Sequence, residues 1–124
     1  MSQKTILYVE DNEFNRKIVR QLLSQTKYQL REAADGESGV KSAQDDPPDL
    51  ILMDVQLPKL SGLDATRRLR ADPRTAALPI IVITSYALSS DAEKAKAAGA
   101  TAYLAKPYSP RELLAKIREI LPEG

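Results

Sequence analysis

The chain has 124 residues, 43% of them hydrophobic and 28% charged, a composition that indicates one globular domain spanning residues 1–124. Its 18 basic and 17 acidic residues give a net charge of +1, so no general attraction to nucleic acid or to a membrane surface is expected. Without cysteine or histidine, the chain lacks disulfides, thiolate zinc sites and the commonest general base and transition-metal ligand. No stretch approaches membrane-spanning length and no signal peptide precedes the first strand, so a cytoplasmic protein is expected.

Strand and helix patterns alternate along the chain. Short apolar or β-branched runs predict strands at Thr5–Glu10, Gln29–Ala33, Asp49–Asp54, Ile80–Ser85 and Ala102–Ala105. Helices are predicted at Glu13–Gln25, Gly36–Gln44, Gly62–Ala71, Ser90–Ala98 and Pro110–Leu121. Five successive βα units predict an α/β, flavodoxin-like (βα)5 doubly wound sandwich with a parallel five-stranded sheet in the order 2-1-3-4-5.

Local signals support individual helices. Apolar residues recur at helical spacing in the first helix and predict an apolar stripe along one of its faces. They are Phe14, Ile18, Val19, Leu22 and Leu23. Ser109 is suited to cap the last helix, with Pro110 at its first position. Gly99 follows the fourth helix as a C-terminal cap.

Carboxylates stand at the ends of two strands that the predicted strand order makes neighbours. Asp54 directly follows the apolar run Leu50–Met53, and Glu10 and Asp11 follow Ile6–Val9. The carboxyl ends of parallel strands form the edge at which such sheets bind ligands, so the three acids are expected to converge in one crevice. They would repel one another unless a positive group lies between them.

Two further polar residues end the remaining central strands. Thr84 ends the fourth strand, and Lys106 follows the fifth. Each site residue alone has an ordinary explanation, such as acids placed at a helix N-terminus or a solvated lysine. Their convergence at one sheet edge is what favours a functional site.

Four motifs together give the chain a family resemblance. They are Val9-Glu10-Asp11-Asn12, Leu52-Met53-Asp54-Val55-Gln56-Leu57-Pro58 with Gly62, Ile83-Thr84-Ser85, and Tyr103-Leu104-Ala105-Lys106-Pro107. With this order and spacing, the chain resembles the receiver domain of two-component response regulators. The first, third and fifth helices also resemble those of single-domain cell-fate regulators and of receivers attached to hybrid kinases.

A metal ion is expected at the acid cluster. Oxygen ligands without histidine favour a hard cation, so Mg²⁺ is the natural occupant, and Mn²⁺ could substitute. The resemblance implies that Asp11 and Asp54 ligate the ion directly, that Gln56 contributes its backbone carbonyl, and that Glu10 acts mainly through water.

The resemblance also implies a phosphorelay role. Asp54 would accept a phosphoryl group from a histidine kinase or histidine phosphotransfer protein, with Lys106 and the Thr84 hydroxyl stabilising the phosphoryl oxygens. Thr84 would then move inward and Tyr103 would rotate, changing a surface that docks a downstream protein target. The peptide bond before Pro107 is expected to be cis. The chain would catalyse only its own phosphorylation and dephosphorylation.

The lifetime of the phosphoryl group is expected to depend on two side chains. The resemblance places Gln56 and Tyr86 beside the path of the hydrolytic water. Neither is an acid that could orient this water, and Tyr86 is bulky enough to exclude it. We therefore expect an aspartyl phosphate that is long-lived for the class.

Other functions fit the sequence less well. An aspartyl-phosphate phosphohydrolase would need an acid two residues after the nucleophile, where Gln56 stands. A nucleotide or flavin binder would need a glycine-rich loop after the first strand, and that loop is acidic here. A receiver-fold scaffold or phosphate sink without its own output stays open, as does the choice between a stand-alone regulator and a receiver from a hybrid kinase.

Overall fold

The computed structural model describes residues 3–84 and 89–123, with the side chains of residues 89–91 left out of that description. The strands are β1 (Thr5–Val9), β2 (Gln29–Ala33), β3 (Leu50–Asp54), β4 (Ile80–Thr84) and β5 (Ala102–Ala105). The helices are α1 (Glu13–Leu23), α2 (Gly36–Asp45), α3 (Gly62–Ala71), α4 (Ser89–Ala98) and α5 (Pro110–Ile120). Every expected element is therefore present. The expected strand end at Ser85 and the site residue Tyr86 lie outside the described residues.

The sheet is parallel and has the order β2-β1-β3-β4-β5, which confirms the predicted fold. The register pairs Val9 with Met53, and Asp54 with Ile83. This register brings the carboxyl ends of β1, β3 and β4 to the same edge of the sheet. No helix in the described part of the chain is long and apolar enough to cross a membrane.

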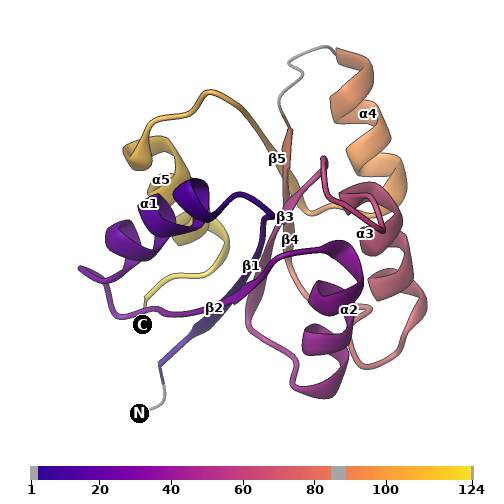
Figure 1. Ribbon diagram of the computed structural model, residues 1–124, viewed down its shortest axis with the longest axis horizontal. Coiled ribbons are helices and arrows are strands. Elements are labelled where there is room, and N and C mark those ends of the chain that lie inside the picture. The colour runs from indigo at the N-terminus through magenta and orange to yellow at the C-terminus, as the bar shows by residue number, and fades with distance from the viewer. Residues whose placement is uncertain (1–2, 85–88, 124) are drawn as a thin grey trace.

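Two helical layers cover the sheet, with α1 and α5 on one face and α2, α3 and α4 on the other (Figure 1). Alternate strand residues enter the two layers, because successive side chains of a strand point to opposite faces. Ile6 and Tyr8 pack with the α1–α5 layer, whereas Leu7 and Val9 pack with the α2–α4 layer. The residues of β3 and β4 are all buried, as expected for central strands of a doubly wound sheet.

The first helix differs from the sequence expectation at its end and on its face. It ends at Leu23 instead of Gln25, because the Thr26 N–H and hydroxyl both donate to the Leu23 carbonyl and turn the chain. Phe14 and Ile18 of the expected apolar stripe are 69% and 40% exposed. The stripe is therefore only partly buried: Val19 and Leu23 are buried, and Leu22 is partly buried against the same core.

Side-chain caps fix the starts of the helices beside the edge. The Asn12 side chain caps α1 by accepting the Asn15 N–H at 2.9 Å. Ser109 caps α5 in a capping box with Glu112, and Pro110 occupies the first turn, which confirms the predicted start. Each cap satisfies backbone donors that the helix itself leaves unpaired.

Gly62 lets α3 begin directly against the end of β3. A Cβ atom placed on Gly62 would lie 1.9 Å from the Asp54 carbonyl oxygen and 2.8 Å from the Val55 Cα. The Gly62 N–H donates to the Val55 carbonyl at 2.9 Å. The obstructing atoms belong to the backbone that carries Asp54. A larger residue at position 62 would therefore displace the carboxyl end of β3.

Gly62→Ala is expected to destabilise the protein by roughly 1–3 kcal/mol through overpacking. Alanine is favoured over glycine in helices by up to about 1 kcal/mol, so the steric effect decides the sign. The measurement is urea unfolding. Gly39→Ala is the control with a smaller expected loss, because the atoms nearest to its Cβ belong to the Val9 side chain and not to the backbone. Equal stability of Gly62→Ala and the parent would contradict the packing argument.

Candidate functional site

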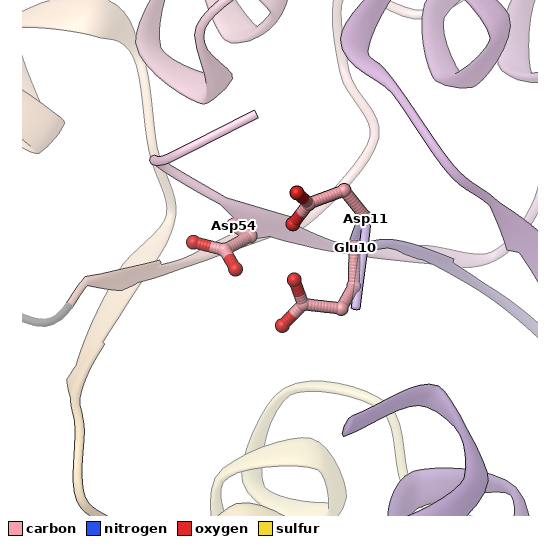
Figure 2. A group of neighbouring side chains, drawn as sticks. All are labelled: Glu10, Asp11 and Asp54. Carbon is pink, nitrogen blue, oxygen red and sulfur yellow. The ribbon is translucent and has the colours of Figure 1, made fainter. Parts of the chain in front are cut away.

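Three carboxylates meet at the carboxyl edge of the sheet, as the strand order predicts. Oxygen atoms of Glu10, Asp11 and Asp54 all lie within 4.8 Å of one another. Figure 2 shows the three carboxyl groups gathered beyond the ends of β1 and β3, with Glu10 and Asp11 extending from successive residues. Glu10 and Asp54 are buried, whereas Asp11 is exposed. The acids that the sequence singled out therefore form one cluster.

Lys106 supplies the positive group that the cluster needs. Its Nζ atom lies 2.9 Å from Asp54 Oδ2 and 3.3 Å from Glu10 Oε1. Lys106 follows β5, two strands away from β3, so its side chain extends past the end of β4 to reach them. Partial burial acts to lower the pKa of the Lys106 ammonium, but the adjacent Asp54 and Glu10 carboxylates outweigh it and raise this pKa. The lysine therefore stays charged in the crevice.

Glu10 is held by several donors, two of which, Tyr8 and Asn15, are not among the predicted site residues. Its Oε1 atom accepts from Tyr8 Oη at 3.3 Å and from Asn15 Nδ2 at 3.1 Å, in addition to Lys106. Its Oε2 atom accepts from the Asn12 N–H at 3.3 Å. Tyr8 could have been found from the two-residue repeat of a strand, which places it on the same face as Glu10. Asn15 could have been found from its place in the first turn of α1.

Arg16 fastens the end of β1 to α1. Its guanidinium donates to the Glu10 carbonyl at 2.6 Å and forms ion pairs with Glu13 at 2.6 Å and Glu32 at 3.3 Å. A hydrogen bond from a charged donor is stronger than one between neutral groups. The backbone at Glu10 is thereby fixed independently of its side chain.

Asp54 is fixed through both of its carboxylate oxygens. Oδ2 contacts Lys106, and Oδ1 accepts the Gln56 N–H at 3.1 Å. Asp54 is only 2% exposed, and the burial of its charge is costly. The Lys106 ammonium and the Gln56 N–H offset this cost. The Val55 N–H donates to the Ile83 carbonyl at 3.0 Å, which extends the pairing of β3 with β4 beyond Asp54.

The remaining predicted site residues lie along the same edge and on β5. Thr84 is buried at the end of β4, and its carbonyl accepts the Lys106 N–H at 2.7 Å. The Lys106–Pro107 peptide bond is cis, as the resemblance implies. Tyr103 lies on β5 in register with Val82 of β4, and it is half-buried against the α2–α4 layer.

The comparisons with known proteins agree with this geometry. The chain is 36% identical over 121 residues to the polar-differentiation response regulator DivK of Brucella anthropi, a match that covers 98% of both chains. The family model described as the response regulator receiver domain matches residues 6–118. The chain belongs to the response regulator receiver family. This receiver domain therefore serves phosphoacceptor signalling in two-component systems.

Solved structures of bacterial receivers share its architecture. The receiver domain of the sensor histidine kinase PA1611 from Pseudomonas aeruginosa has a TM-score of 0.88 and 39% identity, covering 96% of this chain and 98% of that one. A magnesium ion is coordinated in the active-site cleft of that protein. The chemotaxis protein CheY4 of Vibrio cholerae has a TM-score of 0.90 and 29% identity, covering 97% of this chain and 100% of that one.

Asp11 carries the electrostatic cost of the cluster. Removal from water and the neighbouring Glu10 carboxylate raise the pKa of Asp11 above its usual value, although Lys106 acts in the opposite direction. A raised native pKa means that the folded protein binds a proton more readily than the unfolded chain does. The ionised form of Asp11 therefore destabilises the metal-free fold at every pH above its native pKa.

Asp11→Asn is expected to raise the melting temperature of the metal-free receiver domain at pH 7. The gain should shrink as the pH falls through the native pKa towards the ordinary aspartate range, near about pH 4. Thermal unfolding in the presence of a chelator measures both effects. Glu119→Gln, which changes an exposed α5 carboxylate, is the control and should not reproduce the gain. A melting temperature of Asp11→Asn equal to the parent's would contradict the repulsion.

Proposed function

We propose that Asp54 is the phosphoacceptor of a Mg²⁺-dependent response regulator that acts in the cytoplasm and takes its phosphoryl group from a phosphohistidine. The observation that carries this proposal is the placement of Lys106 Nζ, 2.9 Å from Asp54 Oδ2, beside two further carboxylates. A buried, lysine-paired carboxylate at the edge of the crevice combines a nucleophile with a group that neutralises phosphoryl charge.

The donor atoms of the cluster fit a hard divalent cation. All of the side-chain donors are carboxylate oxygens, which suit Mg²⁺ and Mn²⁺ and do not select softer metals. Asp11 and Asp54 would bind the ion directly with the Gln56 carbonyl, and Glu10 would contribute through water. When bound, the ion would neutralise carboxylate charge and orient the phosphoryl oxygens.

The contacts of Asp54 support its proposed role in in-line attack. Its carboxylate is oriented at one oxygen by Lys106 and at the other by the Gln56 N–H. One Asp54 oxygen would form a bond to phosphorus while the bond from phosphorus to the donor's imidazole nitrogen breaks, and that nitrogen keeps the electron pair. Lys106 and the Thr84 hydroxyl would then contact phosphoryl oxygens. Positioning and charge neutralisation are the main requirements of this chemistry, so no histidine of the receiver domain is needed.

An apolar groove beside the crevice supports a protein donor over a small metabolite. The groove has a volume of about 400 Å³ and runs between α1 and the start of α5, where Ile18, Leu22, Pro107 and Tyr108 line it. Lys106 lines the groove as well, so a partner seated there would lie next to the site. A histidine kinase or histidine phosphotransfer protein would have to present its phosphohistidine from a surface that fits this groove.

The proposed output is protein docking and not nucleic-acid binding. Phosphoryl contact with Thr84 would alter the end of β4, and Tyr103 of the neighbouring strand would respond by changing the surface of α4, β5 and α5. A net charge of +1 gives no basis for sequence-independent attraction to nucleic acid. The long phosphoryl lifetime proposed for Gln56 and Tyr86 stays a prediction, and Tyr86 lies outside the described residues.

Incubation with a phosphohistidine donor and Mg²⁺, followed by mapping of the label, tests the acceptor. We expect label on Asp54, and loss of nearly all label in Asp54→Asn or after chelation. Asp49→Asn is a matched control, because Asp49 precedes the same strand at its opposite end and caps only the Thr5 N–H. It should be labelled like the parent. Persistent labelling of Asp54→Asn would refute the assignment.

A further inference from the structure

A tyrosine hydroxyl lies inside the apolar layer directly below the acid cluster. Tyr8 is 0% exposed and packs among Leu52, Ile83 and Leu113 between the sheet and the α1–α5 helices. A phenol hydroxyl in such surroundings requires a hydrogen-bond partner. Tyr8 Oη donates to Glu10 Oε1 at 3.3 Å, so the one polar atom of this side chain is directed at the site.

A second tyrosine packs against the same apolar cluster as the first. Tyr108 is partly buried there and follows Lys106 by two residues. Burial, together with the charges and hydroxyl groups nearby, raises the pKa of Tyr8, so this phenol stays a donor at neutral pH. The Tyr8 hydroxyl therefore remains available to donate to the Glu10 carboxylate.

Glu10 shares Lys106 with Asp54, and this sharing creates a conflict. Lys106 Nζ lies 3.3 Å from Glu10 Oε1 and 2.9 Å from Asp54 Oδ2. When a phosphoryl group is transferred to Asp54, the ammonium must turn towards phosphoryl oxygens. Glu10, which is 1% exposed, would then lose a charged partner in a place where an unpaired carboxylate is costly. Donors that remain on Glu10 reduce this cost.

We propose that Tyr8 is a positioning residue that, with Asn15, keeps Glu10 paired when Lys106 leaves it for the phosphoryl group. This inference rests on the proposed function of Asp54. Tyr8 and Asn15 donate to the same Glu10 oxygen as Lys106, so they compete with the lysine for that oxygen. The Asn12 N–H serves the other oxygen. Glu10 is thus held in place by Tyr8, Asn15 and the Asn12 N–H as well as by Lys106.

Removal of the Tyr8 hydroxyl should affect two measurable quantities in opposite directions. In Tyr8→Phe, Glu10 has one donor fewer, so its charge is less compensated and Mg²⁺ should bind more tightly. Lys106 should also be held more strongly by Glu10, so phosphorylation at saturating Mg²⁺ should be slower. Loss of one hydrogen bond predicts changes of about threefold to tenfold in each. A purely structural role of Tyr8 would change stability without this opposed pair.

The experiment measures Mg²⁺ affinity by calorimetry and the rate of labelling by acetyl phosphate at saturating Mg²⁺, for the parent and three variants. Tyr8→Phe and Asn15→Ala remove donors from the same Glu10 oxygen, and both should show tighter Mg²⁺ binding with slower labelling. Asn15→Ala keeps the test valid if Tyr8→Phe, a substitution in the core, lowers the stability of the protein. Tyr28→Phe is the matched control, because it removes a buried hydroxyl that donates to the Leu121 carbonyl.

The outcomes separate the two proposals. Opposed shifts in Tyr8→Phe and Asn15→Ala, absent from Tyr28→Phe, support the positioning role. If the parent binds Mg²⁺ and is labelled on Asp54 while both variants match Tyr28→Phe in affinity and rate, the positioning role is wrong and the proposed function stands. If the parent neither binds Mg²⁺ nor takes label from acetyl phosphate or from a phosphohistidine donor, both proposals are wrong.

Discussion

The contact of one lysine ammonium with two buried carboxylates is the interaction on which the site depends. Lys106 Nζ lies within 3.3 Å of both Glu10 and Asp54, and Asp11 adds a third negative charge close by. Charges taken out of water are tolerated only when they are paired and hydrogen-bonded. Because one ammonium cannot neutralise three carboxylates, the cluster favours a further cation, and the arrival of a phosphoryl group changes the balance again. The same imbalance therefore accounts for metal affinity and for responsiveness to phosphorylation.

The fold makes this contact possible by fixing the ends of three strands. The parallel order β2-β1-β3-β4-β5 places Glu10 and Asp54 on neighbouring strands and Lys106 two strands beyond Asp54. Gly62 allows α3 to press against the Asp54 backbone, and Arg16 binds the Glu10 carbonyl from α1. These backbone restraints hold the carboxylates at separations that their repulsion opposes. The stability needed for this comes from the apolar layers on both faces of the sheet.

Much of the fold and the acid cluster could be predicted from the sequence, because short apolar strands, Gly and Pro signals and strand-end acids act locally. The strand order brought Glu10, Asp11 and Asp54 together without any knowledge of contacts. Periodicity places Tyr8 in the first strand and Asn15 in the first helix, but it does not specify that both side chains reach the Glu10 carboxylate. It likewise does not specify which apolar residues of α1 stay exposed, as Phe14 does.

Lys106 and Asp54 stabilise each other in the metal-free protein, and a double-mutant cycle tests this coupling most directly. Urea unfolding of Lys106→Met, Asp54→Asn and the double variant, with chelator present, gives their coupling free energy. We predict a coupling of about 1–2 kcal/mol, with Lys106→Met less harmful once Asp54 is neutral. Additivity within about 0.3–0.5 kcal/mol would mean that the two groups act independently, and it would contradict the account.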